Sequence, residues 1–407
     1  MNPGPARPLD GLVVLDLSQY AAGPYCTMMM ADSGARVIKI ERPGDGDPYR
    51  HEGPELTGAD GSVTGGFFVR FNRTKESVTI NLKSADGAAL LRRLAEHADV
   101  LVENFRPDFL DACGVGYRQL HAANPRLIYA SITGFGHQDV LASPYWSWPA
   151  FAVVAEAMGG IMDRIGDADC PPHWSGVSLG DLYAGATAFS GVLLALLQRG
   201  ATGRGQHVDI SMTDSIISLN ERAVFSFGVT GDLPQRGSDP ALAPFGPFEA
   251  RDGWIVIGVI GNPMWHRFAH AIGRPELADD PRLATGLDRG RHMPTVIVPA
   301  ITEWLNSRTR SEATKALLAA NVPAAPVETA RDVLQSPHVS AREMLLDVSY
   351  PGYGSYKVVA SPFKLSDDLT PHIGPVPRLG EHTRAVLTSL GGLDDDQLAQ
   401  FAERGVI

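Results

Sequence analysis

Residues 12–40, LVVLDLSQYAAGPYCTMMMADSGARVIKI, hold the pattern that decides the fold. Residues 12–17 form a short apolar run, which is typical of a strand buried on both faces. Residues 22–31 predict a helix, because Pro24 lies near its start, where a missing N–H costs nothing. Residues 36–40 predict a second strand. A strand, a helix and a strand of these lengths indicate two parallel strands joined by a right-handed crossover.

The same alternation continues to about residue 211. Further strands are predicted at residues 77–82, 99–103, 127–132 and 207–211, and further helices at 87–97 and 182–197. Strands that alternate with helices in this way are typical of an open α/β sheet.

The second half of the chain has a different character. Residues 233–247 are rich in Pro and Gly, and they are followed by a predicted strand at 254–259 and predicted helices at 264–272 and 296–307. Residues 225–325 therefore predict a smaller second domain. Beyond Pro326 the pattern predicts a strand at 354–359 and a closing helix at 383–390.

Composition excludes several classes of protein. The 407 residues include 44% hydrophobic and 20% charged residues, which is too apolar for a disordered chain. The 35 Lys+Arg against 46 Asp+Glu give a net charge of -11, and nucleic acids and anionic membranes bind basic surfaces. Neither partner is therefore expected, although a local basic pocket for a small anion is compatible with this charge.

The cysteines and the apolar runs indicate in which cellular compartment the protein is expected. Three separated cysteines and no CxxC pair favour a reducing environment. The beginning of the sequence lacks the pattern of a signal peptide, and the most apolar run, residues 189–197, is shorter than the roughly 20 residues of a membrane span. We therefore expect a cytoplasmic protein without a membrane partner.

Common catalytic motifs are absent. The sequence has no phosphate loop, no HExxH, no EF-hand loop and no GxSxG elbow. Residues 18–24, after the first strand, lack the glycine spacing of a dinucleotide fingerprint. The twelve histidines show no metal-ligand spacing, so no metal site is predicted.

Basic residues recur where predicted strands end. Lys39 and Arg42 lie at the end of the second strand, Lys83 follows the third, and Arg106 follows the fourth. Ligands of open α/β sheets bind outside the carboxyl ends of the strands. Each basic residue could also be a solvated surface charge, so an anion-binding pocket and a charged surface both stay open at this point.

Asp181 stands just before the long predicted helix. Asp is a favoured helix N-cap, which gives the residue a purely structural interpretation. A carboxylate can also form covalent acyl intermediates, and a helix N-terminus stabilises an anion there. Both interpretations are compatible with the sequence.

Motifs along the whole chain resemble the formyl-CoA:oxalate and carnitine CoA-transferase family, also called class III CoA-transferases. The matching segments are residues 9–11, 15–16, 22–24, 35–44, 46–47, 75–77, 102–105, 133–136, 180–181, 202–206 and 379–383. The resemblance implies a Rossmann-like large domain formed by residues 1–222 and 326–407, with residues 225–325 as a smaller inserted domain. It also implies that two ring-shaped chains interlock into a homodimer.

The resemblance further implies CoA transfer from an acyl-CoA to a small carboxylate, for which dicarboxylates such as succinate have family precedent. Coenzyme A enters as a thioester substrate, and no permanently bound cofactor is expected. Asp181 would attack the acyl-CoA and carry a covalent aspartyl-CoA thioester. The residues that would hold CoA are Gln19, Tyr20, Ala21, Ala22, Arg42, Ile80, Lys83, Asn104 and Phe105.

Two departures from the family pattern bear on the mechanism and on the binding of coenzyme A. Many relatives carry Tyr-Asp or a similar acidic pair where this chain has Phe151 and Ala152. The 2-methylacyl-CoA racemases, a branch of the family, use a histidine at the position of Phe151, and Phe cannot shuttle a proton. An arginine that some relatives carry is Ala112 here. A racemase or epimerase is therefore one alternative, opposed by Phe151, and a CoA-binding relative without turnover is another, opposed by Asp181.

An aromatic stretch at residues 145–149 replaces a Gly-Pro-containing segment of the family. The stretch could pack on the domain surface, or it could form the wall of an acyl pocket. In the second case Trp146, Trp148 and Phe151 are the expected substrate-pocket residues.

Overall fold

Two parts of the chain pack separately in the computed structural model, which describes residues 7–237, 242–367 and 373–407. Unit 1 comprises the described residues up to Met162, together with Trp174–Glu221 and Ser340–Ile407. Unit 2 comprises Asp163–His173 and Arg222–Val339. Unit 1 is thus assembled from segments near both ends of the chain.

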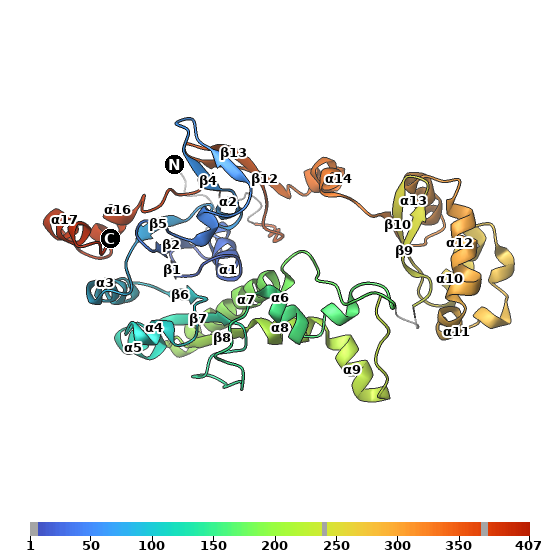
Figure 1. Ribbon diagram of the computed structural model, residues 1–407, viewed down its shortest axis with the longest axis horizontal. Coiled ribbons are helices and arrows are strands. Elements are labelled where there is room, and N and C mark those ends of the chain that lie inside the picture. Colours follow the sequence, from blue (N-terminus) through green and yellow to red (C-terminus); the bar gives the residue numbers. More distant parts are fainter. Residues whose placement is uncertain (1–6, 238–241, 368–372) are drawn as a thin grey trace. The chain divides into compact units, whose positions relative to one another are not determined.

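A parallel sheet of six strands forms the centre of unit 1 (Figure 1), which confirms the predicted parallel α/β arrangement. Its strands, in sheet order, are β5 (Glu76–Thr79), β2 (Arg36–Glu41), β1 (Val13–Asp16), β6 (Val100–Glu103), β7 (Ile128–Thr133) and β8 (His207–Ser211). In chain order the sheet strands run third, second, first, fourth, fifth and sixth. This is the order of a doubly wound sheet, whose direction of winding changes between the first and fourth strands, here β1 and β6.

Helices cover both faces of this sheet, because successive strand residues point to opposite sides. Val14 belongs to one core cluster and Leu15 to the other, and Val37 and Ile38 divide in the same way. The first face is covered by α1 (Ala22–Asp32), α6 (Ala152–Met158), α7 (Leu179–Thr202) and α8 (Met212–Leu219). The second face is covered by α3 (Ala85–Ala95), α4 (Phe109–Ala112), α5 (Tyr117–Ala123), α16 (Thr383–Ser389) and α17 (Asp395–Glu403).

The C-terminal segment completes unit 1. Helix α16 contacts strand β5 near the beginning of the chain (Figure 1). A hairpin of β12 (Leu345–Tyr350) and β13 (Gly354–Val359) packs on the short helix α2 (Phe67–Phe71). Phe68, Val348 and Val376 form a separate small core there. A second hairpin consists of β3 (Glu55–Thr57) and β4 (Val63–Gly65).

Several local predictions need correction. Helix α7 begins at Leu179 and has Ser178 as its N-cap, so Asp181 is the third helical residue and not the cap. The helix also runs through residues 200–202, where the glycines predicted a turn. Helix α17 follows the helix that was predicted to close the chain. Helix α2 and the β3–β4 hairpin were not predicted, because these elements are too short to give a clear pattern of apolar residues.

Helix α7 is longer and more apolar than the sequence pattern predicted. By length and composition its 24 residues could cross a membrane, whereas the predicted apolar run covered only residues 189–197. In the structure Ala188 and Val192 of α7 lie in the core with α1 and the sheet. A buried core helix meets the same criteria of length and composition as a membrane span, so those criteria do not assign α7 to a membrane.

Unit 2 is built around a three-stranded antiparallel sheet in the order β11 (Ala324–Pro326), β10 (Gly253–Gly258) and β9 (Phe245–Ala250). Trp265, Phe268 and Leu317 belong to its core. Helices α10 (Asn262–Ala271), α11 (Gly286–Arg291), α12 (Val298–Leu305) and α13 (Arg310–Ala319) contribute buried residues. Helices α9 (Glu221–Thr230), α14 (Ala330–Gln335) and α15 (Pro337–Ala341) contain no buried residue.

Candidate functional site

A cavity of about 200 Å³ opens in unit 1 at the carboxyl ends of the sheet strands. Its walls come from the segments that follow β1, β2 and β6, from the end of β7 and the start of α8, and from the segment before α6 and the start of α7. Because β1 and β6 flank the point where the winding reverses, the cavity occupies the place where doubly wound sheets bind ligands.

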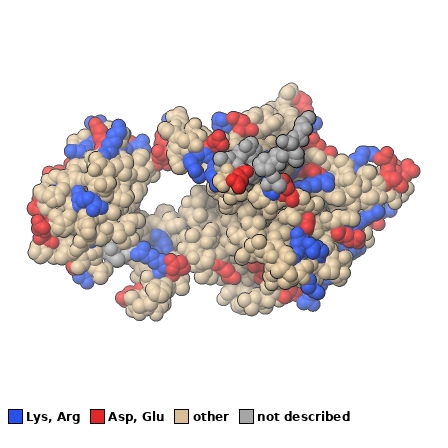
Figure 2. Space-filling model, turned by 180° about the vertical axis from the view of Figure 1, so that it is seen from behind, with Lys and Arg blue, Asp and Glu red and all other residues tan. Residues whose placement is uncertain are grey.

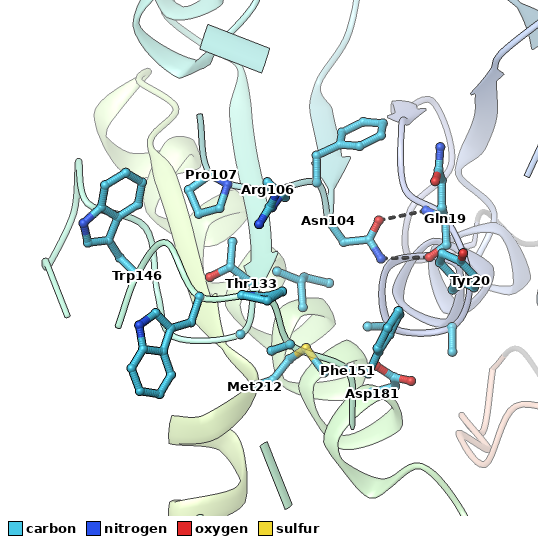
Figure 3. Close-up of a pocket in the computed structure, with 18 of the residues that line it drawn as sticks. Gln19, Tyr20, Asn104, Arg106, Pro107, Thr133, Trp146, Phe151, Asp181 and Met212 are labelled. Carbon is cyan, nitrogen blue, oxygen red and sulfur yellow. Dashed lines mark hydrogen bonds between the residues drawn. The ribbon is translucent and has the colours of Figure 1, made fainter. Parts of the chain in front are cut away.

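The cavity brings together most residues that the sequence singled out (Figure 3). The predicted residues that line it are Gln19, Tyr20, Ala21, Ala22, Asn104, Phe105, Trp146, Trp148, Phe151 and Asp181. Arg42, Ile80 and Lys83 are not among its lining residues. The Ile80 side chain is buried in the core, while Lys83 is exposed and Arg42 pairs with Asp45 at the surface.

The basic residues at the strand ends do not act together as an anion pocket. Lys39 is fully buried, and its Nζ lies 2.9 Å from Asp47 Oδ2. Lys75 Nζ is equally buried and lies 2.8 Å from Asp16 Oδ2. Buried cations of this kind neutralise acidic side chains inside the fold and cannot reach a ligand. The sequence could not distinguish them from Arg106, which is exposed and lines the cavity.

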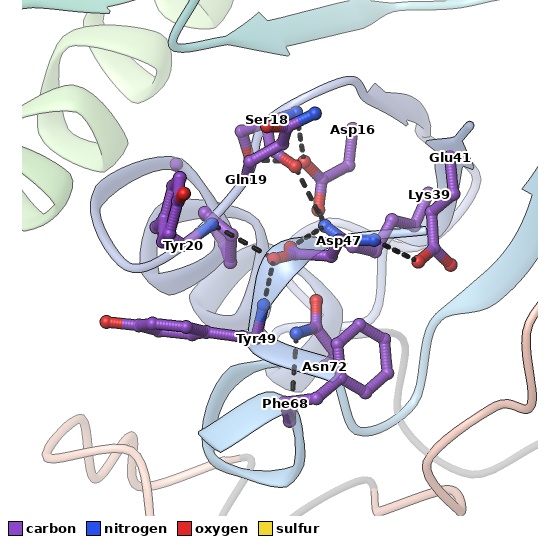
Figure 4. A network of polar contacts seen from close by, with 12 residues as sticks. Asp16, Ser18, Gln19, Tyr20, Lys39, Glu41, Asp47, Tyr49, Phe68 and Asn72 are labelled. Carbon is purple, nitrogen blue, oxygen red and sulfur yellow. Dashed lines mark hydrogen bonds and ion pairs between the residues drawn. The ribbon is translucent and has the colours of Figure 1, made fainter. Parts of the chain in front are cut away.

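The loop after β1 is held by side chains from two other loops (Figures 3 and 4). Asn104 Oδ1 accepts from the Gln19 backbone N–H at 2.8 Å, and Asn104 Nδ2 donates to the Gln19 carbonyl at 2.8 Å. Asp47 Oδ1 accepts from the backbone N–H groups of Tyr20 at 3.2 Å and Tyr49 at 3.0 Å. The two bonds from Asn104 and the bond from Tyr20 to Asp47 fix the position of the loop against the cavity, while the bond from Tyr49 holds Asp47 within its own turn.

Tyr20 takes up an unfavourable backbone conformation within this loop. Its φ is +61°, in the left-handed region that costs a non-glycine residue about 1–2 kcal/mol. Gly23 follows at the start of α1, and a Cβ there would lie 2.1 Å from the Ser18 Cβ. The close approach therefore requires glycine at 23, and it brings the N-terminus of α1 to the cavity wall.

Asp181 reaches the cavity from the first turn of α7. Burial raises the pKa of its carboxyl to about 6, and the negative charge of Glu156 adds to this rise, while the positive charge of Arg70 opposes it. Above pH 6 the group is an ionised carboxylate with little water around it. Such a carboxylate is a stronger base and nucleophile than one in bulk solvent.

Six aromatic side chains also line the cavity. The Tyr20 ring packs edge-on against Tyr49 and Phe151, with centroids 5.5 Å and 6.1 Å apart. Trp148 contacts Tyr145 and Phe135 at 4.5 Å and 6.0 Å. The aromatic stretch that the sequence left between two interpretations therefore lines the cavity through Trp146 and Trp148.

Sequence reasoning missed several lining residues. Tyr49, Thr133 and Met212 line the cavity but belong to three separate elements, a short turn after β2, the end of β7 and the start of α8, and no local motif marks them as members of one site. Arg106 carried the weak signal of a basic residue after a strand. Within the described ranges, no group of three or more His, Cys, Asp or Glu side chains is placed to hold a metal ion.

The charges of unit 1 and unit 2 are mixed at the surface. On the face that Figure 2 shows, Lys and Arg side chains are interspersed with Asp and Glu. Arg70 and Arg106 are exposed cations near the cavity, in contrast to Lys39 and Lys75. The cations identified near the cavity are therefore individual side chains, Arg70 and Arg106.

Both the sequence and the structure of this chain resemble those of known proteins. The model of CoA-transferase family III matches residues 9–383. A succinyl-CoA:mesaconate CoA-transferase of Haloarcula marismortui is 39% identical over 94% of this chain and 96% of its own length. A succinyl-CoA–D-citramalate CoA-transferase of Chloroflexus aurantiacus is 38% identical over 99% of both chains. A crystal structure of a CAIB/BAIF family protein from Brucella suis superposes with a TM-score of 0.82 at 33% identity, covering 95% of this chain and 100% of that one.

Proposed function

The chain belongs to CoA-transferase family III, and on that premise we propose that it moves coenzyme A from an acyl-CoA to a carboxylic acid through a covalent aspartyl-CoA thioester on Asp181. The observation that carries the proposal is the half-buried Asp181 carboxylate at the end of an aromatic cavity. The cavity offers space for an acyl thioester beside this carboxylate, and the family supplies the class of reaction.

Each step follows from carboxylate and thiolate chemistry. Asp181 attacks the acyl carbon of the thioester and expels CoA thiolate, which leaves a mixed anhydride. The thiolate attacks the Asp181 carbonyl carbon and releases the donor acid, so the enzyme holds an aspartyl-CoA thioester. An acceptor carboxylate attacks that thioester, and the thiolate then attacks the acceptor carbonyl of the new anhydride. The product acyl-CoA leaves and the Asp181 carboxylate is restored.

The surroundings of Asp181 suit this sequence of steps. Water would hydrolyse the anhydride and the thioester, and the aromatic walls limit its access. The first N–H groups of a helix have no partner within the helix and carry positive partial charge. Helix α1 begins at Ala22 on the cavity wall, so its first turn could stabilise the oxyanions that form on the acyl carbons.

CoA itself would extend from the cavity along the strand ends. We propose that the loop residues Gln19–Ala22 contact its thiol end and that Asn104 and Phe105 contact its pantetheine arm. Arg42, Ile80 and Lys83 lie outside the cavity lining and remain predicted contacts for the nucleotide end. Arg106 joins them as an exposed cation suited to a phosphate group.

The acyl groups are proposed to be small carboxylic acids. The two relatives described above are named for succinyl-CoA and for mesaconate or citramalate. A free volume of about 200 Å³ matches small acids better than long acyl chains. We therefore propose a small carboxylic acid, including dicarboxylic acids, on both sides of the exchange.

Phe151 argues against racemisation at this site. Its side chain lines the cavity next to Tyr20 and is 67% exposed within the chain. A racemase needs a group at this position that removes and returns the acyl α-proton, and a phenyl ring has no such proton. Deuterium exchange at the acyl α-carbon would distinguish the two reactions, and its absence is expected.

The chain is proposed to work as a homodimer in which two copies interlock, with the two units as the large and small domains. Leu194 and Leu197 on α7 are 68% and 75% exposed. Phe225 and Val229 on α9 are each 69% exposed, on a helix with no buried residue. Apolar surfaces of this extent on both units are typical of interfaces, and a second copy of the same chain is the occupant that the family fold implies.

Peptide mass mapping tests the proposal directly. The protein is incubated with a panel of acyl-CoAs, and the peptide that contains Asp181 should gain the mass of CoA less water, in a hydroxylamine-sensitive bond. Asp181→Ala should lose this adduct and lower kcat by at least about 10³-fold. Asp214→Ala is the matched control, because Asp214 is likewise the third residue of a helix, α8, but does not line the cavity. Full turnover by Asp181→Ala would overturn the mechanism.

A further inference from the structure

Glu156 is a buried carboxylate that the proposed chemistry does not use. It lies on α6, is fully inaccessible to solvent, and does not line the cavity. An ionised carboxylate buried without partners would be strongly unfavourable, so its contacts indicate why it is there. In the described structure its side chain hydrogen-bonds to the segment that leads to Asp181.

Three N–H groups converge on the Glu156 carboxylate. Its Oε1 accepts from the Trp174 indole N–H at 3.2 Å and from the Gly180 backbone N–H at 3.4 Å. Its Oε2 accepts from the Ser175 backbone N–H at 3.4 Å. The carboxylate therefore joins both ends of residues 174–180 to α6, and Gly180 is the residue immediately before Asp181.

Packing between two helix starts reinforces this link. A Cβ at Gly180 would lie 2.7 Å from the Ala152 carbonyl oxygen, so the beginning of α7 touches the beginning of α6. Ser178, between the two anchored ends, takes a left-handed conformation with φ +52°. Unfavourable conformations of this kind persist only where surrounding contacts hold them. The hydrogen bonds to Glu156 are such contacts.

We propose that Glu156 is the positioning residue for Asp181: it fixes the turn that carries the nucleophile and places a second negative charge behind it. The proposal rests on the function assigned to Asp181 above. A negative charge near a carboxyl group in a site of low dielectric raises the pKa of that group, and Glu156 acts on Asp181 in this direction. The charge on Glu156 therefore keeps Asp181 more basic, and a more basic carboxylate is a better nucleophile toward a thioester.

The charged groups around Asp181 determine whether each substitution raises or lowers the pKa of its carboxyl. Arg70 acts on Asp181 in the opposite direction to Glu156, and the Tyr49 phenol lies close enough to interact with both Asp181 and Arg70. The Arg70 guanidinium lies over the Phe67 and Phe71 rings, 5.2 Å and 4.5 Å from their centroids. Removing the negative charge at 156 and removing the positive charge at 70 should thus have opposite effects on Asp181.

The test is the pH profile of kcat/KM, together with the rate of adduct formation on the Asp181 peptide. The parent should lose activity below about pH 6, where Asp181 becomes protonated. In Glu156→Gln the acid limb should move to lower pH, so that its activity relative to the parent is at least about 2.5-fold higher at pH 5 than at pH 8. That ratio corresponds to a shift of half a pH unit in a one-proton limb. In Arg70→Gln the limb should move to higher pH.

Two further variants distinguish an effect of the Glu156 charge on Asp181 from a purely structural role of Glu156. Trp174→Phe removes one N–H donor but keeps the Glu156 charge, and its acid limb should stay near that of the parent. Glu156→Asp also keeps the charge, so it should retain the limb while lowering kcat through lost contacts. It covers the case in which Glu156→Gln does not fold. Equal limbs in Glu156→Gln and Trp174→Phe, or a shifted limb in Glu156→Asp, would overturn the proposal. Absence of any Asp181 adduct in the parent would instead overturn the proposed function.

Discussion

Replacement of Asp47 by Asn tests how the fold holds the loop that forms one wall of the cavity. Asp47 Oδ1 accepts from the backbone N–H groups of Tyr20 and Tyr49, and Asp47 Oδ2 pairs with Lys39 (Figure 4). Asn has nearly the same shape, and its oxygen can still accept from the two N–H groups. Its NH₂ group, however, would face the Lys39 ammonium, so the variant removes one charge from a fully buried ion pair.

The expected loss of stability follows from the partners that Lys39 keeps. Breaking a buried pair by removing one charge costs about 3–5 kcal/mol. Lys39 Nζ still donates to the Ser18 carbonyl at 2.8 Å and lies 4.0 Å from Asp16 Oδ2, so the lower end, about 3 kcal/mol, is expected. At roughly 2–4 °C per kcal/mol, Tm should fall by about 6–12 °C.

Asp45→Asn is the matched control, two residues away on the same loop. Asp45 pairs with Arg42, and both side chains are more than 60% exposed. Exposed pairs contribute about 0–1 kcal/mol, so Tm should hardly change. Thermal unfolding of both variants is followed by circular dichroism at one protein concentration. A Tm of Asp47→Asn within about 2 °C of that of Asp45→Asn would refute the argument that the buried pair holds this loop.

Three further results are expected. Asn104→Ala removes two hydrogen bonds to the Gln19 backbone, which contribute about 1–3 kcal/mol. In steady-state kinetics it should lower kcat/KM for the acyl-CoA by roughly 5- to 150-fold and leave the acid limb of the pH profile unchanged. An unchanged kcat/KM would contradict this expectation. In the parent, kcat/KM should fall as the pH drops through about 6, because the proposed attack requires ionised Asp181, and a flat profile down to pH 5 would exclude Asp181 as the titrating group. Leu197→Glu places a charge on the exposed apolar side of α7 and should convert the proposed homodimer to monomer in light scattering; a dimer in both the parent and the variant would remove α7 from the proposed interface.

The order of elements along the first half of the chain was predictable from local sequence. Short apolar runs such as residues 12–17 alternate with amphipathic helices, and this pattern requires a parallel sheet with crossovers. The strand order was not predictable, because pairing depends on contacts between segments such as β1 and β6, about ninety residues apart. That order places the cavity between the loops after β1 and β6.

Which basic residues are buried in ion pairs and which are exposed at the cavity was decided by the tertiary structure. Lys39 and Arg106 both follow the same rule, a basic residue at or after a strand, yet one is buried in an ion pair and the other is exposed at the cavity. Burial is a property of what packs around a side chain, and no local pattern reports it. For the same reason the sequence did not predict a role for Glu156, because its hydrogen-bond partners begin eighteen residues further along the chain.

By itself the sequence determined the α/β class and the family, and it singled out Asp181 as the candidate nucleophile, because ordered motifs and hydrophobic periodicity can be read from the sequence alone. Only the tertiary structure decided that Asp181 lies in the first turn of α7 and not at its cap, which aromatic rings face it, and which charges act on it. Electrostatic interactions and packing act over distance in space, and that distance is set by the fold and not by separation along the chain.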